Sequence, residues 1–501
     1  MNINLISEKD YKFEKGVIIF PLFENETAEF KRLALPDELL AQINSFIESG
    51  SFSGKLYQIT PFNIMLDGNM VAAILTGLGK QEDITLWNFG GALNLALQCA
   101  GGLKAASADV ALRKINNADY EIYAEYAARI AASGDYSFDK YKSKKSGAKC
   151  PDNVNLIVRH MDISKPFETI AENAMNEAEA LALVKDLSNE PANVINPVNL
   201  AEIASQCAGK YGYEAQIGNL SFIQELKMGA YLAVAQGAAD EPRLIVLRYK
   251  GNKDSSSTYA LVGKGLTYDS GGYSLKPSSS MDTMYTDMTG AATVIGAMNL
   301  IAANNLGVNV TAVIASCANM VSGGAYRPGD IVKAMSGKTI EVNNTDAEGR
   351  LTLADAITYA ISEENAGTVI DVATLTGAVG TALGDEITGV MSNDDGLYAD
   401  FRAASEAASE KIHRLPLEKS YKKFLKSGRA DMKNSGGRFA GTITAGLFLS
   451  EFTDNAKWIH FDIAATARCS KATELMNKGA TGVMVMTLYK YFEMKSSILD
   501  E

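Results

Sequence analysis

The side chains best suited to chemistry lie in two segments of the 501-residue chain. In the first segment, 258–290, an expected strand runs into a glycine-rich loop, and the segment carries Lys264, Asp269, Lys276 and Asp287. Ligands of open α/β sheets bind beyond the carboxyl ends of the strands. We therefore expect these four side chains to belong to a ligand site.

The second segment, 340–353, is expected to form a short strand that runs into Asp346, Glu348 and Arg350. Residues two apart in an extended chain project to the same side. These three side chains can therefore converge on one spot, which also lies at the carboxyl end of a strand.

Four carboxylates in one cleft repel each other, and such a cluster persists when divalent cations neutralise it. Oxygen ligands with one amine suit zinc, manganese, cobalt or magnesium better than soft metals. Two metals about 3.5–4 Å apart, bridged by a carboxylate and a water, would produce a hydrolytic nucleophile near neutral pH. The two segments thus predict a hydrolytic metal site.

Each carboxylate also has a purely structural interpretation. Asp287 could cap the N-terminus of a helix, and Asp346 and Glu348 could belong to a turn, because acidic residues favour helix starts. For any single residue this interpretation is the better one. It accounts poorly for the whole set, which includes three basic side chains in the same two segments.

Several other catalytic sites are excluded by the sequence. The three histidines, His160, His413 and His460, begin no His-Glu-x-x-His helix, which excludes that type of zinc protease. Residues 337–339 resemble the end of a phosphate-binding loop, but Val332 stands where its first glycine must be. No Gly-x-Ser-x-Gly elbow occurs, so a metal site must depend on carboxylates.

The composition is that of an ordinary soluble protein, with 47% hydrophobic and 21% charged residues. The net charge of -12 argues weakly against nucleic acid as the main partner. The odd number of dispersed cysteines indicates free thiols in a reducing compartment. Because neither a signal peptide nor a membrane-spanning run of about 18 apolar residues is evident, we expect a cytoplasmic location and no membrane partner.

The pattern of expected elements divides the chain into two α/β domains. In a smaller N-terminal α/β domain, 1–165, the strands 17–22 and 70–76 precede a helix-like stretch, 91–106, and we expect a scaffold or regulatory role. A larger catalytic domain, 166–501, is expected to contain a mixed sheet flanked by helices. Its expected strands are 243–249, 258–263, 308–315 and 367–372, and its expected helices are 287–303, 352–362 and 440–452.

The octapeptide Asn344–Leu351 resembles the signature of the leucyl aminopeptidase family. The stretches 262–265, 269–272 and 275–277 resemble the first metal segment of the same family. The resemblance is good over roughly 180–490 and faint in the N-terminal region. It implies a metal-dependent aminopeptidase that releases leucine or other apolar residues from the free N-termini of peptides.

The resemblance also implies a role for each metal ligand. Lys264, Asp269, Asp287 and Glu348 would hold one metal, and Asp269 and Glu348 would bridge to a second. Asp346 would complete the shell of the second metal. Two divalent ions per subunit are implied, with manganese or zinc preferred over cobalt or magnesium.

Other residues match the family's catalytic and substrate positions. Lys276 would stabilise the developing oxyanion, and Arg350 would bind a bicarbonate ion that acts as the general base. The free amine of the substrate would coordinate one metal. The family assembles as a hexamer of two trimers, so a homohexamer is expected. The residues around the pocket for the first substrate side chain would be Met284, Thr374, Leu375 and Gly377.

Two alternatives to an active peptidase remain open. Some relatives regulate transcription or recombination, and the basic run 140–149 is the candidate surface for nucleic acid. Charge runs are usually solvated, so a surface loop is the favoured interpretation of this run. A catalytically dead assembly protein is the second alternative, and the retention of every expected ligand argues against it.

Overall fold

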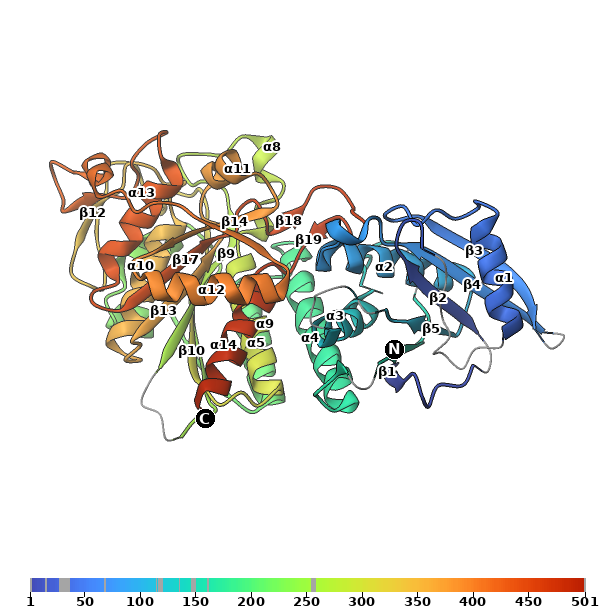
Figure 1. The fold of residues 1–501 in the computed structure, drawn as a ribbon. Helices are drawn as coiled ribbons and strands as arrows, with labels where there is room; N and C mark the ends of the chain where they lie inside the picture. The colour runs from blue at the N-terminus through green and yellow to red at the C-terminus, as the bar shows by residue number, and fades with distance from the viewer. Residues whose placement is uncertain are drawn as a thin grey trace. The chain divides into compact units, whose positions relative to one another are not determined.

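The computed structural model describes residues 2–13, 16–26, 37–66, 69–113, 115, 120–134, 136–145, 150–159, 162–253 and 258–499. His160 and residues 146–149 of the basic run lie outside the described residues. The chain divides into two compact units, 1–182 with 470–478, and 183–469 with 479–501 (Figure 1).

The first unit is built on a six-stranded sheet in the order β1-β6-β5-β2-β4-β3. All neighbouring strands are parallel except β3 and β4. The expected strands 17–22 and 70–76 correspond to β2 and β4. The strands are β1 (Asn2–Ser7), β2 (Val17–Leu22), β3 (Ile59–Leu66), β4 (Asn69–Gly77), β5 (Ser107–Ala111) and β6 (Asn153–Val158), and the helices are α1 (Asp37–Glu48), α2 (Leu86–Gly102), α3 (Tyr120–Ser133) and α4 (Phe167–Asn189).

Every residue of the central strand β2 is buried, because apolar side chains cover both faces of the sheet. On one face β2 packs with α2 and α3, and on the other it packs with α1. Residues 140–145 of the basic run are exposed.

The division between the units falls within α4, whereas the sequence places the boundary at 165. The reason is that Ile170 and Ala174 of this continuous helix are buried in the core of the first unit. The segment 470–478 returns to the first unit, where Asn94 Nδ2 donates to the Glu474 carbonyl at 2.8 Å.

The second unit is built on an eight-stranded mixed sheet in the order β15-β14-β17-β13-β9-β10-β8-β7. The four central strands, β17, β13, β9 and β10, are parallel to one another. The strands are β7 (Glu214–Gly218), β8 (Arg243–Lys250), β9 (Tyr259–Asp269), β10 (Asn309–Asn319), β13 (Thr368–Ala373), β14 (Ile387–Ser392), β15 (Lys411–Arg414) and β17 (Lys457–Asp462).

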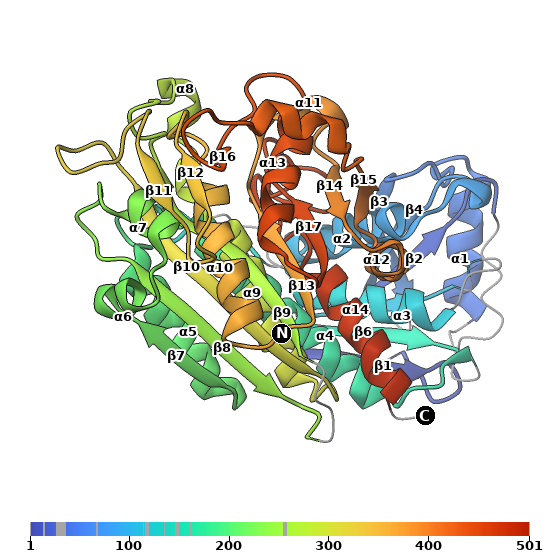
Figure 2. The same cartoon turned by 90° about the vertical axis from the view of Figure 1, so that its left-hand side faces the viewer.

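Helices cover both faces of this sheet, as the sequence predicts (Figure 2). Helix α9 packs on the central strands together with α5 and α14, and α10 packs on the opposite face with α7 and α13. The helices are α5 (Pro197–Tyr211), α6 (Leu220–Glu225), α7 (Gly229–Ala235), α8 (Ser278–Met281), α9 (Thr289–Ala303), α10 (Gly349–Ser362), α11 (Gly377–Leu383), α12 (Asp395–Ala408), α13 (Gly441–Leu449) and α14 (Val485–Leu499).

Smaller elements complete the second unit. A small three-stranded sheet has the order β11-β12-β16, and its central strand β12 leads into the loop that precedes α10. The remaining short elements are β11 (Ile331–Lys333), β12 (Thr339–Glu341), β16 (Met432–Lys433), β18 (Arg468–Cys469) and β19 (Gly479–Ala480), and the 3-10 turns include η3 (Met284–Thr286).

Strand β9 is longer than the sequence indicates, and the glycine-rich stretch at Lys264 lies inside it. Gly263 is needed there because a Cβ atom would stand 2.7 Å from the Ala291 Cα of α9. The glycine thus permits the close approach of a helix to the strand. The expected loop begins only after Asp269.

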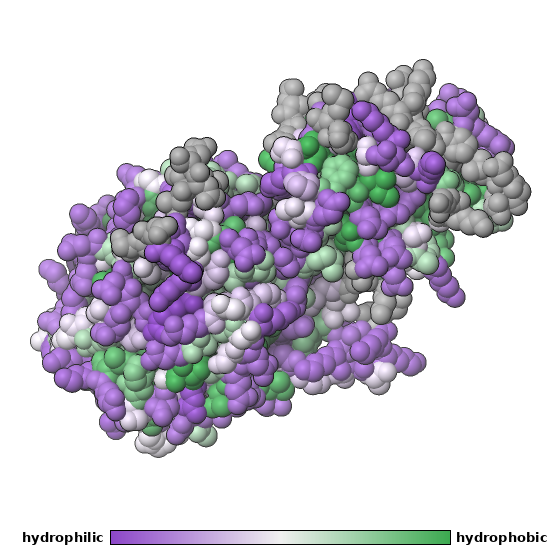
Figure 3. Space-filling model, turned by 90° about the horizontal axis from the view of Figure 1, so that it is seen from below, coloured by the Kyte–Doolittle hydropathy of each residue, from purple (hydrophilic) through white to green (hydrophobic). Residues whose placement is uncertain are grey.

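On the face drawn in Figure 3, hydrophilic residues prevail and hydrophobic residues lie in small groups between them. No helix in the described part of the chain combines the length and the apolar character that a membrane span requires.

Candidate metal centre

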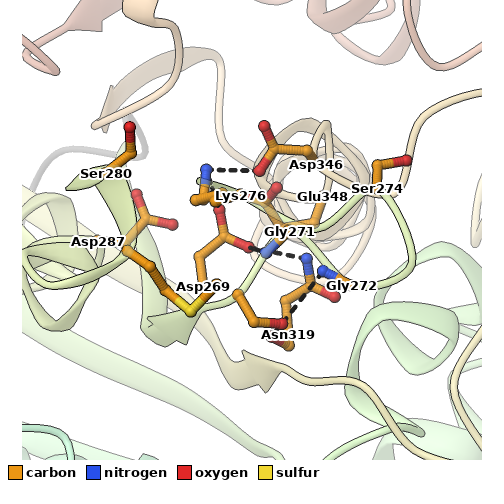
Figure 4. Close-up of polar contacts among 12 residues, drawn as sticks. Asp269, Gly271, Gly272, Ser274, Lys276, Ser280, Asp287, Asn319, Asp346 and Glu348 are labelled. Carbon is orange, nitrogen blue, oxygen red and sulfur yellow. Dashed lines mark hydrogen bonds and ion pairs between the residues drawn. The ribbon is translucent and has the colours of Figure 1, made fainter. Parts of the chain in front are cut away.

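The candidate centre lies at the carboxyl ends of the parallel strands β9 and β10. Asp269 is the last residue of β9, and it pairs in register with Asn319, the last residue of β10. The Asp269 Oδ1 atom accepts hydrogen bonds from Asn319 Nδ2 at 2.8 Å and from the Gly271 amide at 2.9 Å (Figure 4). The sheet itself therefore fixes the orientation of this carboxylate.

The loop between β12 and α10 supplies two further carboxylates, Asp346 and Glu348. Asp269, Asp346 and Glu348 each place one carboxylate oxygen so that all three atoms lie within 4.8 Å of one another. Asp346 and Glu348 therefore meet as the sequence predicts, whereas Arg350, the third residue of that prediction, lies in the first turn of α10.

Two lysines lie among these carboxylates. Lys264 Nζ is 2.9 Å from Asp287 Oδ1 and 2.9 Å from Glu348 Oε1, and it donates to the Thr374 carbonyl at 2.8 Å. Its side chain is buried at the centre of β9. The first lysine therefore joins carboxylates from two different loops.

The second lysine approaches the cluster from the loop that follows β9. Lys276 Nζ is 2.8 Å from Asp269 Oδ2 and 2.5 Å from Asp346 Oδ1. Figure 4 shows it on the same side of the cluster as Asp346. Each lysine thus pairs with two of the four carboxylates, Lys264 with Asp287 and Glu348 and Lys276 with Asp269 and Asp346.

The electrostatics of the cluster follow from its burial. Desolvation raises the pKa of Asp269 and of Asp287, and the neighbouring Glu348 carboxylate raises both further. Desolvation also acts on Glu348, but the charges of Lys264 and Lys276 outweigh it and hold the pKa of Glu348 below its usual range. The four carboxylates thus carry more negative charge than the two lysines can neutralise.

The helix-cap interpretation of Asp287 is wrong, whereas Asp346 does lie in a turn. Glu348 occupies the N-cap position of α10 without a capping hydrogen bond from its side chain. Asp287 follows η3, and the side chain of Asp287 contacts Lys264 and Thr374 rather than the amides of α9. Neither the Asp287 nor the Glu348 side chain caps its helix, so helix capping does not explain why these two carboxylates are buried.

Two carboxylate oxygens in the centre remain unpaired. Asp287 Oδ2 and Glu348 Oε2 are buried and have no hydrogen-bond partner within the described residues. An unpaired buried polar atom costs about 1–3 kcal/mol, and more when it carries charge. Unpaired carboxylate oxygens beside an amine donor fit divalent cations that take oxygen and nitrogen ligands.

The four residues predicted for the substrate pocket lie on two segments near the cluster. Thr374 follows β13, and its Oγ1 donates to Asp287 Oδ1 at 2.7 Å. Leu375 is partly buried against the core, and its amide donates to Asp462 Oδ1 at 3.2 Å. Gly377 begins α11 and Met284 begins η3, which leads directly into Asp287.

Arg350 lies in the first turn of α10 and is buried. Its Nη1 atom donates to the Asn434 carbonyl at 2.8 Å, and its Nε atom has no partner in the described part of the structure. Desolvation lowers the pKa of Arg350 to about 10, against the raising effect of Glu348. Unused donors on a buried guanidinium are suited to an anion.

The sequence did not single out Asn319, Asn434 or Asp462 as parts of this centre. Asn319 is the last residue of β10, beside Asp269. A polar residue at the end of a buried run is a signal that could have indicated it. Asp462 ends β17 and accepts from the Leu375 and Thr376 amides, which fixes the loop after β13. The residues around Asn434 form no pattern that would have indicated its part in this centre.

Comparison with known proteins supports the assignment of this centre to a metal-dependent peptidase. The catalytic-domain model of the cytosol aminopeptidase family matches residues 182–489, and the N-terminal-domain model of this family matches residues 19–145. A probable cytosol aminopeptidase of Clostridium perfringens (strain 13 / Type A) is 43% identical, over 97% of this chain and 98% of that protein.

Two solved structures resemble the fold closely. A mutant of tomato leucine aminopeptidase has a TM-score of 0.86 and 33% identity, and it covers 98% of this chain and 96% of its own. The bottromycin maturation enzyme BotP in complex with Mn has a TM-score of 0.84 and 30% identity, over 96% of this chain and 99% of its own.

These matches favour the enzyme over the nucleic-acid-binding alternative. They extend over both units of the chain, and the family is one of metal-dependent hydrolases. The chain therefore belongs to the cytosol aminopeptidase family and is a metallo-aminopeptidase.

Proposed function

We propose that this chain uses two divalent metal ions to release leucine or other apolar residues from the free N-termini of peptides. The observation that carries the proposal is the convergence of Asp269, Asp346 and Glu348 oxygens within 4.8 Å. Asp287 and Lys264 adjoin this cluster, and two of its carboxylate oxygens are unpaired.

Lys264, Asp269, Asp287, Asp346 and Glu348 would hold the two ions, with Asp269 and Glu348 shared between them. Bound ions of this kind act as Lewis acids and generate a water nucleophile near neutral pH. Lys264 must give up its proton to serve as a ligand, and a nearby dication favours that loss. Manganese or zinc is the preferred metal, and the manganese complex of the bottromycin enzyme supports manganese.

Lys276 would stay charged and stabilise the oxygen that gains negative charge as the peptide carbonyl is attacked. Preorganised donors of this kind are strongest where water is excluded. Arg350 would hold a bicarbonate ion that accepts a proton, and its unpaired buried Nε supports an anion at this place.

Specificity for a free amine would come from its coordination at the centre, beside Asp287. Thr374 contacts Asp287 directly, so a pocket formed by Met284, Thr374, Leu375 and Gly377 would receive the first side chain. The partly buried Leu375 supports an apolar preference.

The assembly and location belong to the same proposal. We expect a homohexamer in the cytoplasm, as the resemblance to the family implies. The names of the relatives as cytosol aminopeptidases support the location.

Two assays on purified protein test the function. Removal of metal by a chelator should abolish hydrolysis of a leucine amide, and manganese, zinc or cobalt should restore it. Acetylation of the substrate's N-terminus should abolish turnover. Full activity of a verified metal-free sample would refute the metal mechanism, and equal hydrolysis of acetylated and free peptides would refute the exopeptidase.

A further inference from the structure

Asn434 is a buried asparagine that the reaction outlined above does not use. It follows β16 and lies beside the loop that carries Asp346 and Glu348. Its Oδ1 atom accepts from the Asn343 amide at 2.9 Å and from the Asn344 amide at 3.3 Å. Its Nδ2 atom donates to the Asn344 carbonyl at 2.7 Å and to the Ala347 carbonyl at 3.2 Å.

The main chain of Asn434 is also engaged at this place. Its amide donates to the Glu341 carbonyl at 3.0 Å, which continues the pairing of β12 with β16. Its carbonyl accepts from Arg350 Nη1 at 2.8 Å. One residue therefore contacts the strand before the loop, the loop itself and the first turn of α10.

A second asparagine makes the reciprocal contact at the surface. Asn343 Nδ2 donates to the Ser435 carbonyl at 3.1 Å, and Asn343 Oδ1 accepts from the Ser435 amide at 3.0 Å. The loop before α10 and the segment after β16 are thus joined by side-chain amides from both partners.

The chemistry at the buried contact requires a primary amide. The loop presents two N–H donors and two carbonyl acceptors to Asn434, and only a side chain with both an oxygen acceptor and an NH2 donor satisfies them all. Aspartate offers no donor when ionised, and an aliphatic residue offers neither group. Unsatisfied, these backbone groups would favour another conformation of the loop.

We propose that Asn434 is a positioning residue that holds Asp346 and Glu348 in the geometry needed to bind metal. This inference rests on the proposed function, in which both carboxylates are ligands. Mutation of a group that orients a metal ligand typically costs about 10–100-fold in metal affinity or activity. A loop that changes its backbone angles would separate two carboxylates whose oxygens now lie within 4.8 Å.

The test compares two aspartate substitutions, Asn434→Asp and Asn94→Asp. Asn94 is also buried and donates to a backbone carbonyl, but it belongs to the first unit. The affinity of each metal-free protein for Mn²⁺ is measured by calorimetric titration, together with the melting temperature and with kcat and KM at saturating Mn²⁺.

We expect Asn434→Asp to lower the Mn²⁺ affinity about 10–100-fold, while Asn94→Asp keeps the parent affinity. A purely structural role for Asn434 would lower the melting temperature of Asn434→Asp and leave its Mn²⁺ affinity at the parent value, and that outcome overturns the inference. If Asn434→Asp does not fold, Asn434→Ser decides the same comparison, because a hydroxyl can serve only part of the four groups.

Failure of this inference is distinguishable from failure of the proposed function. A parent protein that binds no Mn²⁺ would refute the metal centre itself. A parent that binds Mn²⁺, with an Asn434→Asp variant that binds it equally well, would refute only the positioning role.

Discussion

Two lysines share one carboxylate cluster but differ in their surroundings. Lys264 is held by two carboxylates and by the Thr374 carbonyl, and its side chain is 3% exposed. Lys276 contacts Asp269 and Asp346 from a loop, and its side chain is 15% exposed. The more accessible lysine is the one that can meet a substrate carbonyl.

The first prediction concerns Lys276→Ala. Because Lys276 would stabilise charge that appears only in the transition state, kcat should fall about 10²–10³-fold with little change in KM. Metal content should not fall, because the proposed ligand set does not include Lys276. Steady-state kinetics and metal analysis on the same sample check this, and a change confined to KM would assign Lys276 to substrate binding.

The second prediction concerns Arg350→Ala. Arg350 would act through a bound anion. Its loss should therefore lower kcat by at most about 10²–10⁴-fold, the range typical of a lost general base. Added bicarbonate should change the activity of the parent and of the variant differently. If the variant loses bound metal, Arg350 supports the ligands rather than an anion.

At the scale of elements, helix α10 begins in direct contact with strand β9. A Cβ atom at Gly349 would stand 2.4 Å from Lys264 Cε and 2.7 Å from Lys264 Nζ. Lys264 is buried and cannot move aside without losing its contacts with Asp287 and Glu348. The first residue of the helix must therefore lack a side chain.

The third prediction follows from this contact. Gly349→Ala should lower activity about 10–100-fold by displacing Lys264, since small misplacements at a reacting centre are costly. Gly367→Ala is the matched control, because a Cβ atom there meets nothing within 4 Å. Equal activities of the two variants would show that the cluster tolerates the displacement.

Strands β13 and β17 carry a second buried charge pair. His460 Nδ1 lies 2.5 Å from Asp371 Oδ1, and Trp458 Nε1 donates to Asp371 Oδ2 at 2.6 Å. Burial lowers the pKa of His460, but the Asp371 carboxylate raises it more, so the pKa lies above its usual value. The native protein therefore binds this proton more tightly than the unfolded chain does.

The fourth prediction is the pH dependence of this pair. A raised folded-state pKa gives a stabilisation that is fully present below about pH 6.5 and is lost as the pH rises through the folded-state value. The coupling energy between Asp371→Asn and His460→Gln should be about 1.5–3 kcal/mol below that pH and smaller above it. Urea unfolding of a double-mutant cycle measures this coupling, and a pH-independent value would mean that His460 stays neutral.

At the scale of the whole molecule, the fifth prediction is the assembly. The proposed homohexamer should have a mass near six times 53.6 kDa. Light scattering coupled to size-exclusion chromatography measures the mass, and activity is assayed across the same peak. An active species with the mass of a single chain would contradict the hexamer.

The class of the fold and the proximity of Asp346 to Glu348 could be predicted from the sequence. Strand β2 is a short apolar run, and the octapeptide at 344–351 places Asp346 and Glu348 two residues apart. The apolar pattern is a local signal, because burial on two faces requires continuous apolar side chains. The proximity of Asp346 and Glu348 arises through a turn at 345–346 and a helical backbone at Glu348 rather than through an extended chain. The metal ions themselves stay a prediction.

The contacts that hold the centre in place could not be predicted from the sequence. The amide of Asn434 meets a loop some ninety residues earlier in the chain, and Asn319 meets Asp269 across 50 residues. The boundary between the units falls within helix α4 rather than at 165, because Ile170 and Ala174 pack in the first unit. Such contacts join segments that are distant in the chain, and a long-range hydrogen bond leaves no periodicity or spacing in the sequence around either partner.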